Sequence, residues 1–246
     1  MLLSWIMGFS ILGSLGAIAG AALLLLFPAQ TRRLVVPGLL SYATGTLLGA
    51  AFLGMIPAAL QQAPARAVTG TVLAGIVAFF LLEKLLLWRH CHDSDCAVHS
   101  RPAPLILIGD AFHNFVDGVV IAAAFMNSIT LGVVTSLAVV AHEVPQEAGD
   151  FGILLDSNYS RGRALLLNTL SATATVPGAL IAYFWLDEVR HAVPYILGLS
   201  AASFIYIATA DLMPVLHQQV ARAASLRQFM LLLAGIGTIA AFQLGK

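Results

Sequence analysis

Long apolar stretches constrain the fold of this chain more than any other feature. Eight of them, most exceeding 20 residues, are separated by short polar connectors. The hydrocarbon core of a bilayer takes about 20 helical residues to cross, and lipid offers the backbone no hydrogen-bond partners. The sequence therefore predicts an all-α polytopic membrane protein with spans at about 2–27, 34–60, 67–88, 104–127, 130–155, 163–186, 192–216 and 226–245.

The composition supports one membrane domain. Of the 246 residues, 59% are hydrophobic and only 10% are charged, which is far less charge than soluble domains carry. The eight spans occupy almost all of residues 1–246, so we expect a single transmembrane domain. The formal net charge is zero, and we therefore expect no nucleic-acid partner.

The basic residues predict the orientation of the spans. Connectors after the first, third, fifth and seventh spans hold Arg32, Arg33, Arg89, Arg101, Arg161, Arg163, Arg222 and Arg227. The opposite side has Arg66, Arg190 and Lys246, and Lys84 lies within the third span. By the positive-inside rule both termini lie outside, and the protein is expected in a bacterial inner membrane or a plasma membrane.

The connector at 90–101 is then a cytosolic loop with many metal-ligand side chains. It contains HCHDSDCAVH, whose candidate ligands are His90, Cys91, His92, Cys96 and His99. A reducing cytosol argues against a stable disulfide between the two cysteines. Two interpretations remain open, which are transient metal capture and a solvated loop with no ligand role.

Polar residues interrupt the middle of the fourth and fifth spans. Residues three, four and seven apart share a helix face, so Asp110, His113, Asn114 and Asp117 form one polar stripe on the fourth span. On the fifth span, steps of four pair His142 with Gln146 and Glu143 with Glu147. These stripes are the strongest sequence indication of function.

The two histidines are predicted to lie at one depth. A short connector near 127–130 makes the spans antiparallel neighbours, and His113 and His142 are nearly equally far in sequence from Ser128. Each ionisable residue inside a membrane helix costs roughly 2.5 to 3.5 kcal/mol on insertion scales. A bound cation would offset that cost, and a mixed set of imidazole, carboxylate and amide groups suits divalent transition metals.

Two motifs carry a family resemblance. HNFVDG at 113–118 and HEVPQE at 142–147 resemble the signatures of the fourth and fifth helices in the ZIP (Zrt-, Irt-like protein) metal-ion transporters. The resemblance implies an eight-helix bundle with inverted-repeat symmetry, commonly a homodimer. It also implies uptake into the cytosol of a divalent ion, zinc first, with cadmium, iron, manganese and cobalt as further candidates.

The resemblance also implies metal ligands. The main set would be His113, Asp117, His142 and Gln146, while Asn114 and Glu143 would face a second, adjacent metal. Many relatives have His where this chain has Gln146, and an amide oxygen is a harder ligand that favours iron or manganese.

Two further positions depart from the family pattern. In the second span this chain has Gly54 and Ala58 where many relatives have His and Glu. The sixth span has no carboxylate and offers Asn168, Ser171, Thr173 and Thr175. Hydroxyl groups in such a span are expected to bond back to their own helix.

Further acidic residues lie toward the predicted cytosolic side, namely Asp110, Glu147, Asp150 and Asp211. We expect them to form a release path for the ion. We expect no catalytic cofactor and no enzymatic activity. The alternative is an intramembrane zinc protease or hydrolase, whose HExxH motif would require a second His at Gln146 and no proline at 145.

Overall fold

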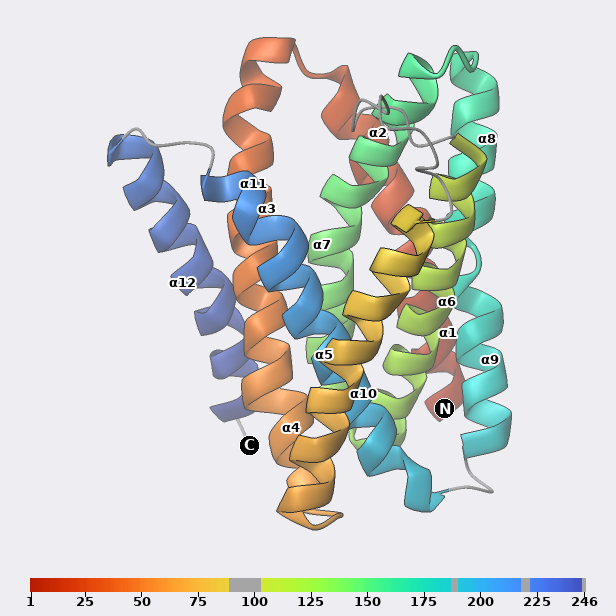
Figure 1. Cartoon of the computed structure of the whole chain (residues 1–246), viewed down its shortest axis with the longest axis vertical. Coiled ribbons are helices and arrows are strands. Elements are labelled where there is room, and N and C mark those ends of the chain that lie inside the picture. The colour runs from red at the N-terminus through yellow and green to blue at the C-terminus, as the bar shows by residue number, and fades with distance from the viewer. Residues whose placement is uncertain (89–102, 187–189, 218–221, 245–246) are drawn as a thin grey trace.

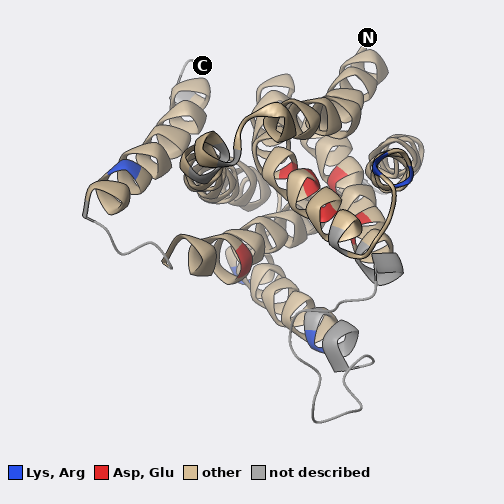
Figure 2. Ribbon diagram, turned by 90° about the horizontal axis from the view of Figure 1, so that it is seen from above, with Lys and Arg blue, Asp and Glu red and all other residues tan. Residues whose placement is uncertain are grey.

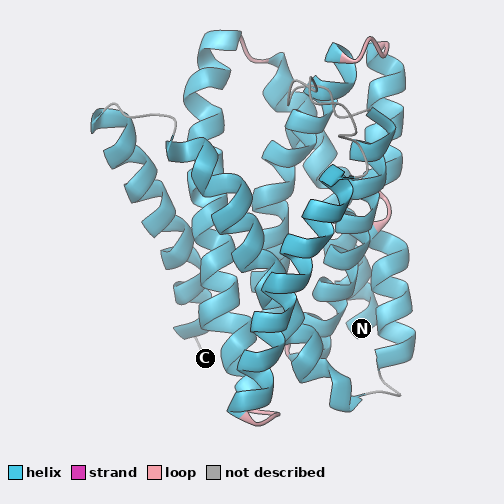
Figure 3. Cartoon of the chain, in the orientation of Figure 1, coloured by secondary structure: helices cyan, strands magenta, loops and turns pink. Residues whose placement is uncertain are grey.

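The computed structural model describes residues 1–88, 103–186, 190–217 and 222–244. Those residues form helices joined by short turns, with no strand among them (Figure 3). Eight helical segments are long and apolar enough to cross a membrane, which confirms the predicted number. They are Leu2–Leu26, Leu34–Leu60, Ala65–Leu82, Leu107–Asn127, Ile129–Leu155, Arg161–Trp185, Val193–His217 and Ala223–Gln243. The start of the first span and the end of the eighth span at Leu244 lie toward the same end of the bundle (Figure 1).

Several spans contain more than one helical element. The first comprises α1 (Leu2–Ile11), the π-helical segment η1 (Leu12–Gly16) and α2 (Ala17–Leu26), and the second comprises α3 (Ala29–Gly49), η2 (Ala50–Met55) and α4 (Ile56–Leu60). The seventh comprises α10 (Val193–Tyr206), η4 (Ile207–Leu212) and α11 (Met213–His217), preceded by the short η3 (Arg190–Ala192). The third and eighth are single helices, α5 (Ala65–Trp88) and α12 (Arg222–Leu244). π-Bulges in helices are frequent near functional sites, and they change which residues face a neighbour.

The sixth span is interrupted in its middle. Helix α8 (Arg161–Ala172) ends and α9 (Thr175–Leu186) begins two residues later, with tight turns in which the Ala174 and Val176 amides bond to carbonyls three residues earlier. Pro177 explains the break, because its ring would clash with the carbonyl of Thr173 in a continuous helix. The interruption lets residues on both sides of it turn toward the bundle centre.

Two unbroken helices form the centre of the bundle. Helix α6 (Ala103–Asn127) and helix α7 (Ile129–Asp156) are joined only by Ser128, whose side chain caps α7 by accepting from the Leu131 amide at 3.1 Å. Seen from above, acidic residues gather mainly on two adjacent helices (Figure 2), and the sequence of α6 and α7 contains no Lys or Arg. The two helices also contribute Ile121, Phe125 and Leu131 to the apolar core, and all three side chains are essentially buried.

Candidate metal centre

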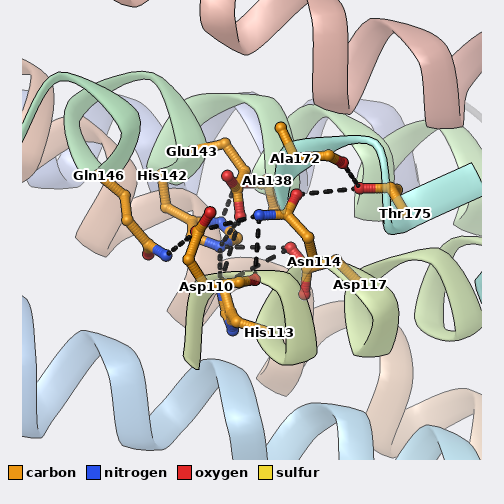
Figure 4. Close-up of polar contacts among 10 residues, drawn as sticks. All are labelled: Asp110, His113, Asn114, Asp117, Ala138, His142, Glu143, Gln146, Ala172 and Thr175. Atoms are coloured by element: carbon orange, nitrogen blue, oxygen red, sulfur yellow. Dashed lines mark hydrogen bonds and ion pairs between the residues drawn. The ribbon is translucent and has the colours of Figure 1, made fainter. Parts of the chain in front are cut away.

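The polar stripes of α6 and α7 face each other. Figure 4 shows side chains from both helices pointing into one common space. The predicted match in depth is confirmed, because Nε2 of His113 and Nε2 of His142 lie 3.1 Å apart. All the stripe residues except His113 and Gln146 are buried, and His113 keeps 19% of its side chain exposed.

Four side chains form the first group, which consists of His113, Asp117, His142 and Glu143. One ligand atom of each lies within 4.8 Å of the others. The His142 Nε2 atom is 3.4 Å from Asp117 Oδ2, and the His113 Nε2 atom is 3.3 Å from Glu143 Oε1. Two imidazoles and two carboxylates at this spacing match the ligand types of a divalent transition-metal site.

Neighbouring groups fix the tautomer and the orientation of the His142 ring. Its Nδ1 atom lies 3.0 Å from the carbonyl oxygen of Ala138, an oxygen that can only accept. Nδ1 therefore carries the proton, and the neutral ring presents a lone pair at Nε2, toward His113 and Asp117. Phe204 of α10 packs edge-on against the ring, with centroids 5.9 Å apart, and limits its rotation.

Among the described residues, the carboxylates of this first group lie near imidazole nitrogens but accept no hydrogen bond of good geometry. Both oxygens of Asp117 and both oxygens of Glu143 are buried and have no hydrogen-bond partner among the described residues. Burying an ionised carboxylate costs several kcal/mol unless a positive charge or donors compensate. A divalent cation between the imidazoles and carboxylates would supply that compensation.

A second group lies beside the first and shares Glu143 with it. Oxygens of Asp110, Glu143 and Glu147 lie within 4.8 Å of one another. Glu147 is fully buried, and neither of its carboxylate oxygens has a hydrogen-bond partner among the described residues. The structure thus brings Asp110 and Glu147, expected on the release path, into direct proximity to Glu143.

Two predicted ligands bond to Asp110. Asn114 donates from Nδ2 to Asp110 Oδ1 at 3.1 Å, and Gln146 donates from Nε2 to the same oxygen at 3.4 Å. Gln146 thus directs its amide nitrogen to Asp110, while Glu143 takes a place beside the two histidines. The expected ligand set and the first group have His113, Asp117 and His142 in common.

The sixth span reaches the centre through two side chains. Thr175 donates to Asn114 Oδ1 at 2.9 Å, and Asn168 donates to the backbone oxygen of Glu147 at 3.1 Å. Ser171 and Thr173 bond back to their own helix, as expected, and the Thr175 hydroxyl also lies 2.8 Å from the Ala172 carbonyl of the same span. The contacts of Asn168 and Thr175 with α6 and α7 were not anticipated. Pro177, which interrupts the span beside them, was the available sequence signal.

The other predicted residues lie apart from these two groups. Asp150 is half-buried about one turn beyond Glu147 on α7, and Asp211 is exposed on η4 of the seventh span. Gly54 lies in η2 of the second span and Ala58 in α4. The loop candidates His90, Cys91, His92, Cys96 and His99 fall outside the described residues.

Comparisons with known proteins agree with the motifs. The family model described as ZIP Zinc transporter matches residues 89–243. Zinc transporter ZIP13 of Pongo abelii is 31% identical over 84% of this chain and 66% of its own length. Zinc transporter zipt-7.2 of Caenorhabditis elegans is 30% identical over 80% of the chain and 56% of its own length.

A yeast relative gives the same result. Zinc transporter YKE4 of Saccharomyces cerevisiae (strain ATCC 204508 / S288c) is 29% identical over 78% of this chain and 64% of its own length. The matches thus span between 56% and 66% of these three curated relatives. With the family model covering more than half of the sequence, and with the eight spans and both motifs in place, the chain belongs to the ZIP zinc transporter family.

Proposed function

We propose that this chain transports divalent transition-metal ions into the cytosol through the centre between α6 and α7, and that zinc is its preferred ion. The observation that carries the proposal is the first group, in which four ligand atoms from two facing spans lie within 4.8 Å. The ion is cargo, so the protein needs no catalytic cofactor and performs no enzymatic reaction. Cadmium, iron, manganese and cobalt are further candidate ions, because the ligand set mixes imidazole with carboxylate.

Residues His113, Asp117, His142 and Glu143 would hold the ion on entry. Gln146 and Asn114 would adjust its affinity through their bonds to Asp110, which lies one helical turn from His113. Release would then proceed over Asp110, Glu147, Asp150 and Asp211 toward the loop at 90–101. Conduction requires binding weak enough for release, and oxygen ligands hold zinc less tightly than imidazoles do.

The proposal includes the molecular setting. Residues 1–246 would act as one transporter domain in a bacterial inner membrane or a plasma membrane, with both termini outside, as a homodimer. The excess of arginine in one set of connectors supports that orientation. In that orientation the loop at 90–101 is cytosolic and meets the ion on release.

The test is metal uptake into proteoliposomes that contain the purified full chain. An indicator dye trapped inside the proteoliposomes reports the uptake of each ion, and the uptake rates of Zn²⁺, Cd²⁺, Fe²⁺, Mn²⁺ and Co²⁺ are compared. Liposomes without protein give the background. We expect saturable uptake, highest for Zn²⁺. Uptake equal to that of empty liposomes for every ion, with correctly inserted protein, would overturn the proposal.

The membrane zinc hydrolase is the competing function. Glu143 beside two histidines resembles the general base of a zinc protease, but Gln146 stands where HExxH has its second His. Transport needs no reacting water at that position. Zinc-dependent peptide cleavage by the purified chain, abolished in Glu143→Gln, would favour the hydrolase instead.

A further inference from the structure

One buried hydroxyl on α7 lacks a partner. Thr135 is fully buried, and its Oγ1 atom has no hydrogen-bond partner among the described residues. A threonine in a helix can bond to the carbonyl four residues earlier, and the adjacent Ser136 does so with the Gly132 carbonyl at 2.7 Å. Threonines elsewhere in the described spans also make this bond, namely Thr44, Thr69, Thr71, Thr169, Thr209 and Thr238. Burying a hydroxyl without a partner costs free energy, so this exception needs a physical reason.

Thr135 shares the inner face of α7 with His142. Seven residues make almost two full turns of helix, so the two side chains point within about 20° of each other, at levels about 10 Å apart. A Cβ at Gly54 of η2 would meet Leu131, four residues before Thr135. Val139, four residues after it, lies against η1 of the first span. Thr135 therefore faces the bundle interior between the first and second spans, in line with the first group.

The rest of this face is apolar outward of His142. Leu131 and Ala138 lie about one turn to either side of Thr135, and both belong to the buried apolar core. The proposed orientation puts Ser128, at the start of α7, on the outer side. An ion that moves from there along this face meets apolar side chains until it reaches the Thr135 hydroxyl. An oxygen with free lone pairs can replace a water molecule in the shell of a hydrated ion.

We propose that the Thr135 hydroxyl is a transient ligand for the ion on its approach from the outer side to the first group. This inference rests on the proposed function, because it takes the first group as the site of the transported ion. A neutral hydroxyl holds a divalent ion less tightly than imidazole or carboxylate does, and passage requires weak binding at each step. The unpaired Oγ1 atom is kept available to the ion at a cost in stability.

Thr135→Val tests this role, because it removes the hydroxyl and nearly keeps the shape of the side chain. We expect zinc uptake into proteoliposomes at low Zn²⁺ concentration to fall roughly fivefold. Zinc affinity in detergent, measured by isothermal titration calorimetry, should stay unchanged because the first group keeps its four ligands. The unfolding temperature should rise by roughly 2 to 4 °C, because an unpaired buried hydroxyl is removed. Thr135→Ser keeps the hydroxyl and should keep wild-type uptake.

Two control variants separate contact with the ion from the removal of a hydroxyl. Thr71→Val makes the same substitution on α5, where the hydroxyl bonds to the Ala67 carbonyl, and it should leave uptake unchanged. Ser10→Ala removes the other hydroxyl among the described residues that is buried without a partner. Because Ser10 lies on α1 and not on the α7 face that leads to His142, this variant should raise the unfolding temperature without slowing uptake.

Chemical accessibility provides a measurement that does not depend on transport. In a chain with Cys91 and Cys96 replaced by serine, Thr135→Cys is exposed to a membrane-impermeant thiol reagent in right-side-out membrane vesicles. We expect the thiol to react, and we expect Zn²⁺ to slow the reaction because the ion occupies the same place. Thr71→Cys in the same chain should not react, because α5 contributes no residue to this face. A residue with only a structural role would give no zinc-dependent labelling.

The possible results distinguish the two proposals. Wild-type uptake in Thr135→Val, or an equal loss of uptake in Ser10→Ala, would overturn the role of Thr135 and leave the proposed function standing. A tenfold loss of zinc affinity in Thr135→Val would mean that the residue acts through the first group, and it would overturn direct contact. A wild-type chain that moves no metal would overturn transport. Zinc-protected labelling of Thr135→Cys would then still support contact with the ion, and its absence would overturn both proposals.

Discussion

Gly118 of α6 packs so closely against the backbone carbonyl oxygen of Thr175 in α9 that no Cβ atom fits between them. From the other helix, Gly178 meets the carbonyl oxygen of Phe115 in the same way. Small residues allow this backbone contact between membrane helices. The close crossing places the Thr175 hydroxyl 2.9 Å from Asn114 Oδ1, so the helix packing and the geometry of the candidate metal centre depend on each other.

Replacing Gly118 by alanine should therefore disturb both stability and binding. The added methyl group meets backbone, which cannot turn aside, so we expect a loss of about 1 to 3 kcal/mol and a lower unfolding temperature in detergent. Gly109→Ala on the same helix is the control, because a Cβ there meets nothing within 4 Å. Equal unfolding temperatures for the two variants would contradict the close contact.

Asp117→Ala should remove most metal binding. Asp117 is fully buried and its Oδ2 is 3.4 Å from His142 Nε2, so its loss removes a charged ligand from the first group. We expect zinc affinity to fall at least tenfold, or about 1.4 kcal/mol, by isothermal titration calorimetry, with slower uptake. Ser136→Ala, which deletes a buried hydroxyl bonded to the Gly132 carbonyl, should leave both unchanged. Wild-type rate and affinity in Asp117→Ala would remove this residue from the ligand set.

Gln146→His should sharpen the preference for zinc. An imidazole is a better zinc ligand than an amide, and the replacement also removes the amide bond to Asp110. We expect the ratio of zinc to manganese uptake to rise about tenfold in competition experiments. Gln62→His is the control, because Gln62 is exposed and bonds only to the Ala58 carbonyl. An unchanged ratio would show that this position does not set selectivity.

The loop residues should tune transport without being required for it. Replacing Cys91, His92 and Cys96 together by serine leaves both groups on α6 and α7 intact, so metal should still pass. We expect a modest change in uptake and a weaker response to metal loaded on the cytosolic side, measured in proteoliposomes. Complete loss of uptake by a folded, inserted triple variant would place the loop on the obligatory path.

Neutralising Asp110 and Asp150 together should slow release more than entry. The first group keeps its four ligands in Asp110→Asn/Asp150→Asn, so zinc binding there should be largely preserved. Fewer carboxylates then receive the ion, and accumulation in vesicles with the cytosolic side inward should be slower. The single variants show which residue is responsible. Wild-type flux in the double variant would mean that these acids only bond to backbone or water.

The sequence by itself determined the class of protein and the matching depth of the two histidines along their helices. Apolar length set the eight spans, because a bilayer fixes how many helical residues must be apolar. Helical periodicity put Asp110, His113 and Asp117 on one face, and counting from Ser128 put His113 level with His142. Both results follow from geometry within a helix, which does not depend on neighbouring helices.

Only the tertiary structure decided which side chains meet. The rotation of α7 against α6 is set by packing across the whole bundle, and it turned Glu143 toward the histidines and Gln146 toward Asp110. The break before Pro177 and the glycine contacts at Gly118 brought Thr175 to Asn114, a pairing 61 residues apart in sequence. Periodicity cannot supply such partners, because the rotation and close approach of two helices depend on residues far from both.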